Sequence, residues 1–172
     1  MHDVPAFASA GPAQREAGLD VAAPLRSSAY TDAPRGVASE IRAICAPYAG
    51  VQLTVTDGLV RIAASHPDGF DIVLSSLGDA WLLALGAWHD ELVSIDAALE
   101  YVALAVSGAI RLKIETRRGK PRRWVVQRRQ AAGSWFDETD MAAPSLWPWG
   151  QKATIYRQNR FSLRDGQPSA AA

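Results

Sequence analysis

The chain has 172 residues, of which 48% are hydrophobic and 21% are charged, and its formal net charge at pH 7 is zero. This length favours one domain with terminal extensions, and the composition is ordinary for a globular protein. Because the net charge is zero, a strong overall field that would steer a ligand toward the whole molecule is excluded.

The chain contains a single cysteine, Cys45, so an intramolecular disulfide is excluded and a reducing compartment is favoured. Cys45 lies among apolar residues in IRAICA, which is typical of a small core residue; no His or acid adjoins it to favour a nucleophile. No apolar run reaches the roughly 18 residues that a membrane helix needs. The N-terminus lacks the basic and apolar regions of a signal peptide. We therefore expect a cytoplasmic protein.

Residues 1–35 are rich in Ala, Pro, Ser and Gly, and they are expected to form a flexible N-terminal arm. A single α+β domain is expected over 36–162, followed by a flexible tail over 163–172. The first helix is predicted within ASEIRAICAPYAG (38–50), with Ser39 as a candidate cap and Pro47 as the stop.

Strand patterns follow this helix. VQLTVT and LVRIAAS flank Asp57-Gly58, a two-residue turn of the type that hairpins favour. FDIVLSS follows a second turn signal at 66–69, and AWLLALGAW (80–88) is expected to form one nearly all-apolar strand. These spacings predict an antiparallel meander.

The period then changes to that of a helix in SIDAALEYVALAVSG (94–108), where Ser94 is a candidate N-cap and Gly108 a C-terminal stop. Strands resume at AIRLKIET, turn at 118–121, and return through RRWVVQRR. A short strand at SWFDET and a last one within 152–161 complete the chain. The predicted fold is α+β: an antiparallel sheet of about six to eight strands with two helices packed on it, a two-layer sandwich.

The charges are unevenly distributed. Residues 57–100 hold eight acids and one base, whereas residues 111–129 hold nine bases and one acid. Such polarity is typical either of a bound polyanion or of two halves that attract each other within one fold or across a dimer. The second interpretation is favoured because the charges cancel so closely.

The basic hairpin is the principal candidate surface. In a nucleic-acid complex its side chains would contact phosphates while Trp124 stacks on a base; the basic candidates are Arg117, Arg118, Lys120, Arg122 and Arg123. Alternatively, these side chains keep a sheet face solvated and guard it against edge-to-edge pairing, or contact an acidic protein. Trp147-Pro148-Trp149 is expected either to plug the end of the sheet or to present Trp147 and Trp149 to a partner.

Other chemistries have weak support. There is no phosphate-binding glycine loop, no Cys-x-x-Cys and no closely spaced histidine pair, so no cofactor, metal site or catalytic residue is assigned. The segment Trp88, His89, Asp90 and Glu91 is a candidate structural or polar site. It is interpreted as a loop leading to the second helix, because three successive polar side chains point in different directions.

A larger pattern extends over residues 80–126. It comprises Gly86, Trp88 and His89, then 97–100, Gly108, 111–112, and finally Gly119, Pro121 and 123–124. This pattern resembles short bacterial proteins that carry a G-W-H element and an R-G-G-x-P-x-R-W hairpin, with no activity assigned to them. Here Arg118-Gly119-Lys120 replaces the double glycine. The resemblance implies that the two elements form one structural unit. Our structural hypothesis for this unit is that Trp124 lies against the strand bearing Trp88 and that His89 hydrogen-bonds the hairpin backbone.

We expect a small, non-catalytic bacterial binding protein, of the accessory, inhibitor or immunity-like kind, acting through charge-complementary protein contacts. The alternatives are a nucleic-acid-binding module that uses the basic hairpin 111–129, and an enzyme with an unrecognised site. The expected partner is a protein or a second copy of the chain; nucleic acid stays open, and no membrane partner is expected.

Overall fold

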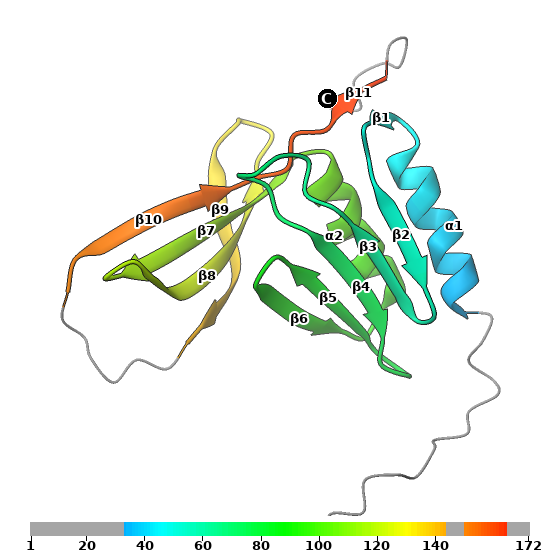
Figure 1. The fold of residues 1–172 in the computed structure, drawn as a ribbon, viewed down its shortest axis with the longest axis horizontal. Coiled ribbons are helices and arrows are strands. Elements are labelled where there is room, and N and C mark those ends of the chain that lie inside the picture. Colours follow the sequence, from blue (N-terminus) through cyan, green and yellow to red (C-terminus); the bar gives the residue numbers. More distant parts are fainter. Residues whose placement is uncertain (1–32, 144–149, 165–172) are drawn as a thin grey trace, which may run out of the picture.

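The computed structural model describes residues 33–143 and 150–164, which form two helices and eleven strands in three antiparallel sheets (Figure 1). The predicted α+β antiparallel class is confirmed. The strands are more numerous than the six to eight expected, and they are divided among three sheets instead of one.

The largest sheet is a five-stranded meander in the order β2-β3-β4-β5-β6. The helices α1 (Ala33–Cys45) and α2 (Ile95–Val106) cover one face of it (Figure 1). Its strands are β2 (Leu53–Thr56), β3 (Leu59–Ile62), β4 (Ile72–Ser76), β5 (Trp81–Leu85) and β6 (Trp88–Leu92).

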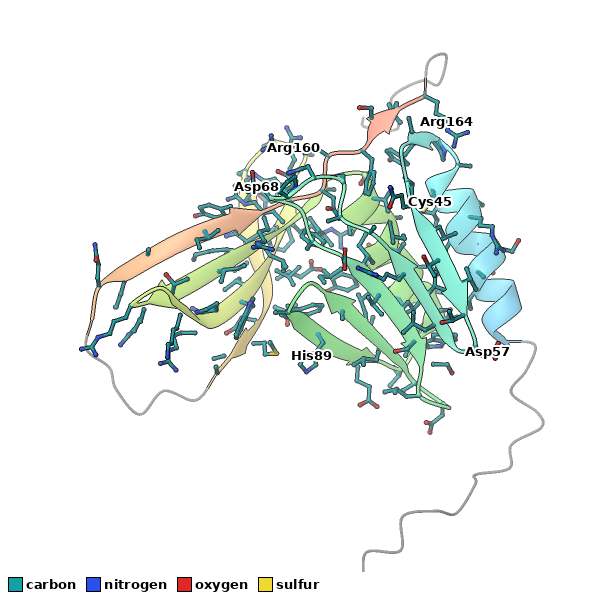
Figure 2. The ribbon with its side chains drawn as sticks, in the orientation of Figure 1. Cys45, Asp57, Asp68, His89, Arg160 and Arg164 are labelled. Atoms are coloured by element: carbon teal, nitrogen blue, oxygen red, sulfur yellow. The ribbon has the colours of Figure 1, made fainter. Side chains whose placement is uncertain are left out.

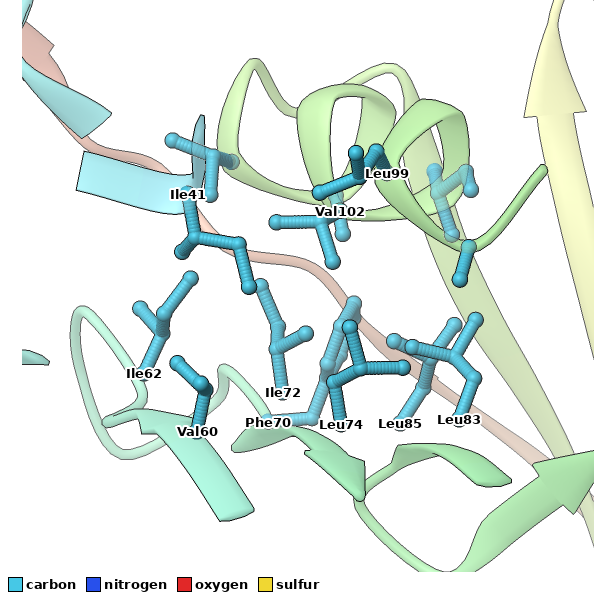
Figure 3. Close-up of a cluster of buried hydrophobic side chains, with 14 of the residues drawn as sticks. Ile41, Val60, Ile62, Phe70, Ile72, Leu74, Leu83, Leu85, Leu99 and Val102 are labelled. Carbon is cyan, nitrogen blue, oxygen red and sulfur yellow. The ribbon is translucent and has the colours of Figure 1, made fainter. Parts of the chain in front are cut away.

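The core lies between this sheet and the helices. Ile41 of α1 and Val102 of α2 pack onto fully buried strand residues, among them Ile62, Ile72 and Leu83 (Figure 3). Burying each large aliphatic side chain contributes about 1.5–3 kcal/mol to the free energy of folding. The alternation of apolar residues in the strands and their helical spacing in α2 place these side chains on one side of each element.

The second sheet has the order β10-β7-β8-β9 and projects beyond the helix-covered sheet (Figure 1). At its inner end, Ile110 and Leu112 join the same core. Its strands are β7 (Ile110–Arg117), β8 (Lys120–Arg129), β9 (Trp135–Ala142) and β10 (Lys152–Arg157). A short third sheet pairs β1 (Tyr48–Ala49) with β11 (Ser162–Leu163), which holds the end of the described chain beside the end of α1.

Two details of the predicted helices differ from the structure. Helix α1 begins at Ala33, ahead of the expected domain boundary at 36, so Ser39 lies inside the helix and does not cap it. Helix α2 is preceded by Ser94 in an extended conformation, as expected, but the Ser94 side chain makes no capping hydrogen bond.

The predicted strand over 80–88 is also wrong as a single element. Gly86 takes a left-handed conformation (φ 59°) and donates its N–H to the carbonyl of Asp71, so the chain reverses there. Glycine adopts this conformation at little cost. The result is a hairpin of β5 and β6, and Trp88 to Glu91 belong to a strand instead of the expected loop.

Candidate functional site

The basic hairpin is a tight one. Arg118 and Gly119 form its two-residue turn, both with positive φ (50° and 73°), as a type I′ turn requires. Pro121 therefore lies in β8 opposite Thr116, not in the turn where the sequence placed it. The hairpin is a fixed part of the sheet, and it carries its bases at the projecting end.

A β-bulge next to this turn increases the density of bases. Arg123 is opposite Glu115 and Pro121 is opposite Thr116, so Arg122 is an extra residue in β8. Bulges bend a strand and redirect a side chain. Arg122 and Arg123 consequently line the same cleft, although they are neighbours in sequence.

This hairpin-end cleft has a volume of about 530 Å³ and is formed by β7, β8 and the start of β10. Its charged lining among the described residues consists of four bases and one acid. The Nε atom of Arg122 is buried and has no hydrogen-bond acceptor within the described part of the chain. Buried donors in native proteins are nearly always satisfied, so this atom is suited to a bound acceptor. The cleft is lined by Glu115, Thr116, Arg117, Arg122, Arg123, Ala143, Lys152, Ala153 and Thr154.

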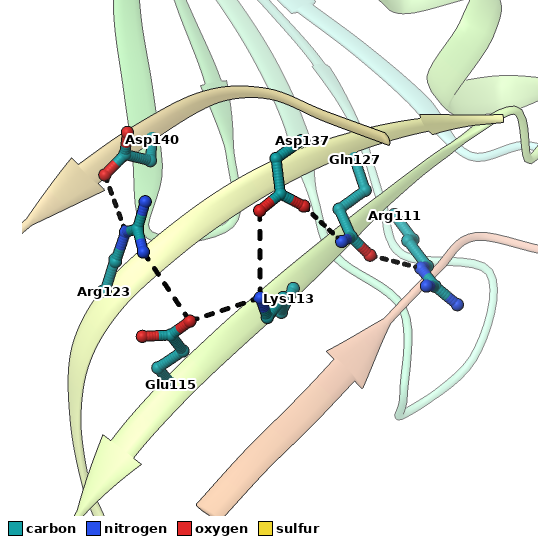
Figure 4. A network of polar contacts seen from close by, with 7 residues as sticks. All are labelled: Arg111, Lys113, Glu115, Arg123, Gln127, Asp137 and Asp140. Carbon is teal, nitrogen blue, oxygen red and sulfur yellow. Dashed lines mark hydrogen bonds and ion pairs between the residues drawn. The ribbon is translucent and has the colours of Figure 1, made fainter. Parts of the chain in front are cut away.

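In the middle of the sheet the bases are paired. Arg123 Nε donates to Asp140 Oδ2 at 2.8 Å, and its Nη1 lies 3.8 Å from Glu115 Oε1 (Figure 4). Lys113 Nζ lies 3.3 Å from the same Glu115 oxygen and 3.8 Å from Asp137 Oδ2. The pKa of Arg123 is raised, chiefly by its hydrogen bond to Asp140. This face of the sheet is therefore a ladder of alternating charges, not a uniformly basic surface.

The ladder ends at Arg111. Its Nε donates to Gln127 Oε1 at 2.7 Å, and Gln127 Nε2 donates to Asp137 (Figure 4). The Arg111 guanidinium also lies over the rings of Trp135 and Tyr156, 4.3 and 4.4 Å from their centroids. Such cation–π contacts hold an arginine in one orientation.

Among the described residues, one ion pair connects the acidic segment 57–100 with the basic segment 111–129. Arg128 Nη2 lies 2.6 Å from Glu100 Oε1 of α2, and Nη1 lies 3.4 Å from Glu138 Oε1 of β9. The other acids that pair with the hairpin bases in the described residues are Glu115 of the hairpin itself and acids of β9, which the charge count over 57–100 did not include. In the sequence, the β9 acids are visible as the run DETD (137–140). This run indicates partners for the hairpin bases only when it is known that β9 pairs with β8.

Trp124 is on the other face of the sheet from Arg123. It is opposite Ile114 and Met141, and it packs against the hydrophobic core. The arrangement that a stacking nucleic-acid site requires, with Trp124 beside the hairpin arginines, is thus not what the structure shows. Trp147 and Trp149 lie outside the described residues.

The candidate polar site at residues 88–91 lies in β6 and contains one buried residue and three exposed ones. Trp88 is 1% exposed and stacks on Tyr101 of α2, whereas His89, Asp90 and Glu91 are exposed (Figure 2 labels His89). The expected hydrogen bond from His89 to the hairpin does not form within the described residues. Strand β6 does contact β8 and β9, so the two elements of the predicted unit are neighbours.

Three findings bear on other chemistries. Within residues 33–143 and 150–164, no group of three or more His, Cys, Asp or Glu could hold a metal ion. In the same residues no helix is long and apolar enough to cross a membrane. Burial raises the pKa of the Cys45 thiol, which disfavours the reactive thiolate at neutral pH.

Comparisons with protein-family models, with curated proteins and with solved structures found no match to this chain. The resemblance of residues 80–126 to short bacterial proteins therefore stays a prediction.

Proposed function

We propose that this chain is a non-catalytic binding protein that contacts an acidic segment of a partner protein through its hairpin-end cleft. The observation that carries the proposal is the segregation of charge within one sheet. Acids of β9 and β7 pair with Lys113 in the middle and with Arg123, which lines the cleft, while Arg122 and Lys152 lie at the projecting end.

The geometry of the cleft suits an extended acidic partner. Arg117, Arg122 and Lys152 come from three adjacent strands, so their side chains are held at strand spacing. Arginine guanidinium groups bind carboxylates bidentately and remain charged at all physiological pH values. The end of the sheet projects from the helix-covered body, so a partner can approach it without meeting the helices (Figure 1).

The position of Trp124 favours a protein over a nucleic acid. Sequence-independent binding of single strands usually combines a basic groove with aromatic rings that stack on bases. Trp124 packs against the core and is not among the described residues that line the cleft. The arginines of the cleft therefore do not have the Trp124 ring beside them. Binding to duplex phosphates alone stays open as the alternative.

The test compares two variants with the same change in net charge. In the cleft variant, the cleft-lining Arg122 and Lys152 and the adjacent hairpin residue Lys120, which is opposite Arg117, are replaced by Ala. In the control variant, Arg42, Arg129 and Arg157, which are exposed elsewhere, are replaced by Ala. Each protein is titrated with a fluorescent ten-residue glutamate peptide, and separately with single-stranded and duplex DNA, at two salt concentrations.

We expect the peptide to bind the wild type and the control variant with similar affinity, more weakly at high salt, and the cleft variant at least tenfold more weakly. Equal loss in both variants would mean a diffuse charge effect and would contradict the cleft assignment. If DNA binds tightly and the peptide does not, and the cleft variant loses DNA binding, the nucleic-acid alternative replaces the proposal.

A further inference from the structure

A second cleft lies at the opposite end of the same sheet face, where the four-stranded sheet meets the loop before β4. It has a volume of about 290 Å³, at the lower end of the range for small-molecule sites. Three separate parts of the chain form it: the loop 65–69, β7, and the end of β10 with the segment that follows it. It is lined by His66, Asp68, Arg111, Tyr156, Gln158 and Arg160.

Arg111 is fixed before any ligand arrives. Its guanidinium is held between the rings of Trp135 and Tyr156, and its Nε is engaged by Gln127. The two terminal nitrogens of Arg111 make no hydrogen bond within the described residues, so they are available to a ligand in the cleft. A preorganised guanidinium loses little entropy on binding and matches the oxygens of a phosphate or carboxylate group.

His66 adds a second donor. Its Nδ1 accepts the backbone N–H of Asp68 at 3.1 Å, so the hydrogen of the neutral ring is on Nε2. That Nε2 is buried and has no partner among the described residues. An orphaned buried donor in a residue that lines a cleft is the feature expected where a ligand supplies the missing acceptor.

Arg160 completes the arrangement. Its backbone N–H donates to Ser65 Oγ at 2.8 Å, and its side chain is exposed and makes no hydrogen bond or ion pair within the described residues. Figure 2 labels Arg160 and Asp68, and the Asp68 carboxylate is the one acid among the described residues of the lining. Two arginines and a histidine therefore line the cleft, together with one carboxylate among the described residues.

From this geometry we propose that the cleft binds the phosphate group of a small molecule. The donors are carried by three separate segments of the chain, so they can contact different oxygens of one tetrahedral oxyanion, whereas a planar carboxylate offers only two. The cleft is small, which limits the ligand to a compact phosphate ester or a similar metabolite. This site is separate from the hairpin-end cleft, and it does not depend on the function proposed for that end.

The experiment titrates the full chain with inorganic phosphate, followed by two-dimensional NMR, at an ionic strength held constant with chloride. Arg160→Ala should weaken binding about tenfold, because one charge-assisted contact is lost. Asp68→Asn should strengthen it several-fold, because the repelling carboxylate is removed while the backbone bonds of Asp68 remain. Arg157→Ala and the Lys120, Arg122, Lys152 variant should bind as the wild type does.

The change in opposite directions for Arg160→Ala and Asp68→Asn separates a binding role from a structural one. The proposal is overturned if the wild type does not bind phosphate, or if folded Arg160→Ala binds it unchanged. It is also overturned if the hairpin-end variant loses the binding, since that places phosphate in the other cleft. Acetate should bind more weakly than phosphate; tighter acetate binding would contradict the phosphate assignment.

Discussion

The side chain of Asn159 binds both backbone groups of Phe70. Its Oδ1 accepts the Phe70 N–H at 3.1 Å and its Nδ2 donates to the Phe70 carbonyl at 2.9 Å, and Asn159 is 0% exposed. The residues are 89 positions apart in sequence. This amide therefore fastens the chain after β10 to the loop before β4, and it holds the four-stranded sheet in place.

Replacing Asn159 with Ala tests this link. The change leaves two buried backbone groups of Phe70 unsatisfied, so we expect the free energy of unfolding to fall by about 3 kcal/mol. Urea denaturation followed by circular dichroism measures it. Arg157→Ala, which truncates an exposed side chain close in sequence, is the control and should change stability by less than about 0.5 kcal/mol. A loss of similar size in both variants would contradict the assigned role.

Two glycine substitutions should have opposite effects. A Cβ at Gly69 would lie 2.5 Å from Asn159 Oδ1 and 3.0 Å from the His66 carbonyl, whereas a Cβ at Gly36, inside α1, would meet nothing within 4 Å. Gly69→Ala should therefore lower the melting temperature. Gly36→Ala should raise the free energy of unfolding by about 0.5–1 kcal/mol, because alanine favours the helix. Thermal unfolding compares them, and a Gly69→Ala protein as stable as the wild type would refute the predicted close packing.

Asp71 should make stability depend on acidic pH. The N–H of Ala64 lowers the pKa of the Asp71 carboxyl most, and the hydrogen bond from Arg61 lowers it further. Because the folded pKa lies below the unfolded value of about 3.9, the stabilisation is complete above that value. It is lost as the pH falls through the lowered pKa. Asp71→Asn should be less stable than the wild type at pH 7, and the gap should narrow below pH 4 in urea titrations. A gap that is independent of pH would be inconsistent with this.

Tyr101 should make the free energy of unfolding depend on pH in the alkaline range. The pKa of its hydroxyl is raised to about 12, chiefly by burial and in addition by the carboxylates of Glu138 and Asp90. The unfolded value is about 10, so the stabilisation is complete below pH 10 and is lost between pH 10 and 12. Tyr101→Phe should lose less stability than the wild type over this range. The measurement is denaturation at successive pH values, and identical alkaline losses of stability in both proteins would contradict the raised pKa of Tyr101.

The sequence predicted correctly those elements that have a regular spacing of apolar residues or a recognisable turn. The alternation in β7 and the helical spacing in α2 were predicted correctly, and so was the turn at Asp57-Gly58, because these patterns are local. The hairpin at Gly86 was missed, because both of its strands begin or end in apolar residues and the turn contains one glycine without a polar neighbour.

The site was less predictable than the fold. Pairing of Arg123 with Asp140 depends on the register of β8 against β9, which sequence spacing does not show. The role of Asn159 could not be predicted from the sequence, because a single buried amide in an irregular segment leaves no periodic pattern of residues. The second cleft is assembled from three distant segments, so neither His66 nor Arg160 was distinguished from other polar residues.

The most direct test of the central claim is to locate the acidic partner on the surface. Backbone amide shifts of the labelled full chain are recorded during titration with the glutamate peptide. We predict that the largest changes cluster at residues 115–123 and 152–154 around the hairpin-end cleft, and that the changes at β6 stay small. Changes that are absent, or spread evenly over exposed bases such as Arg42 and Arg129, would contradict the account.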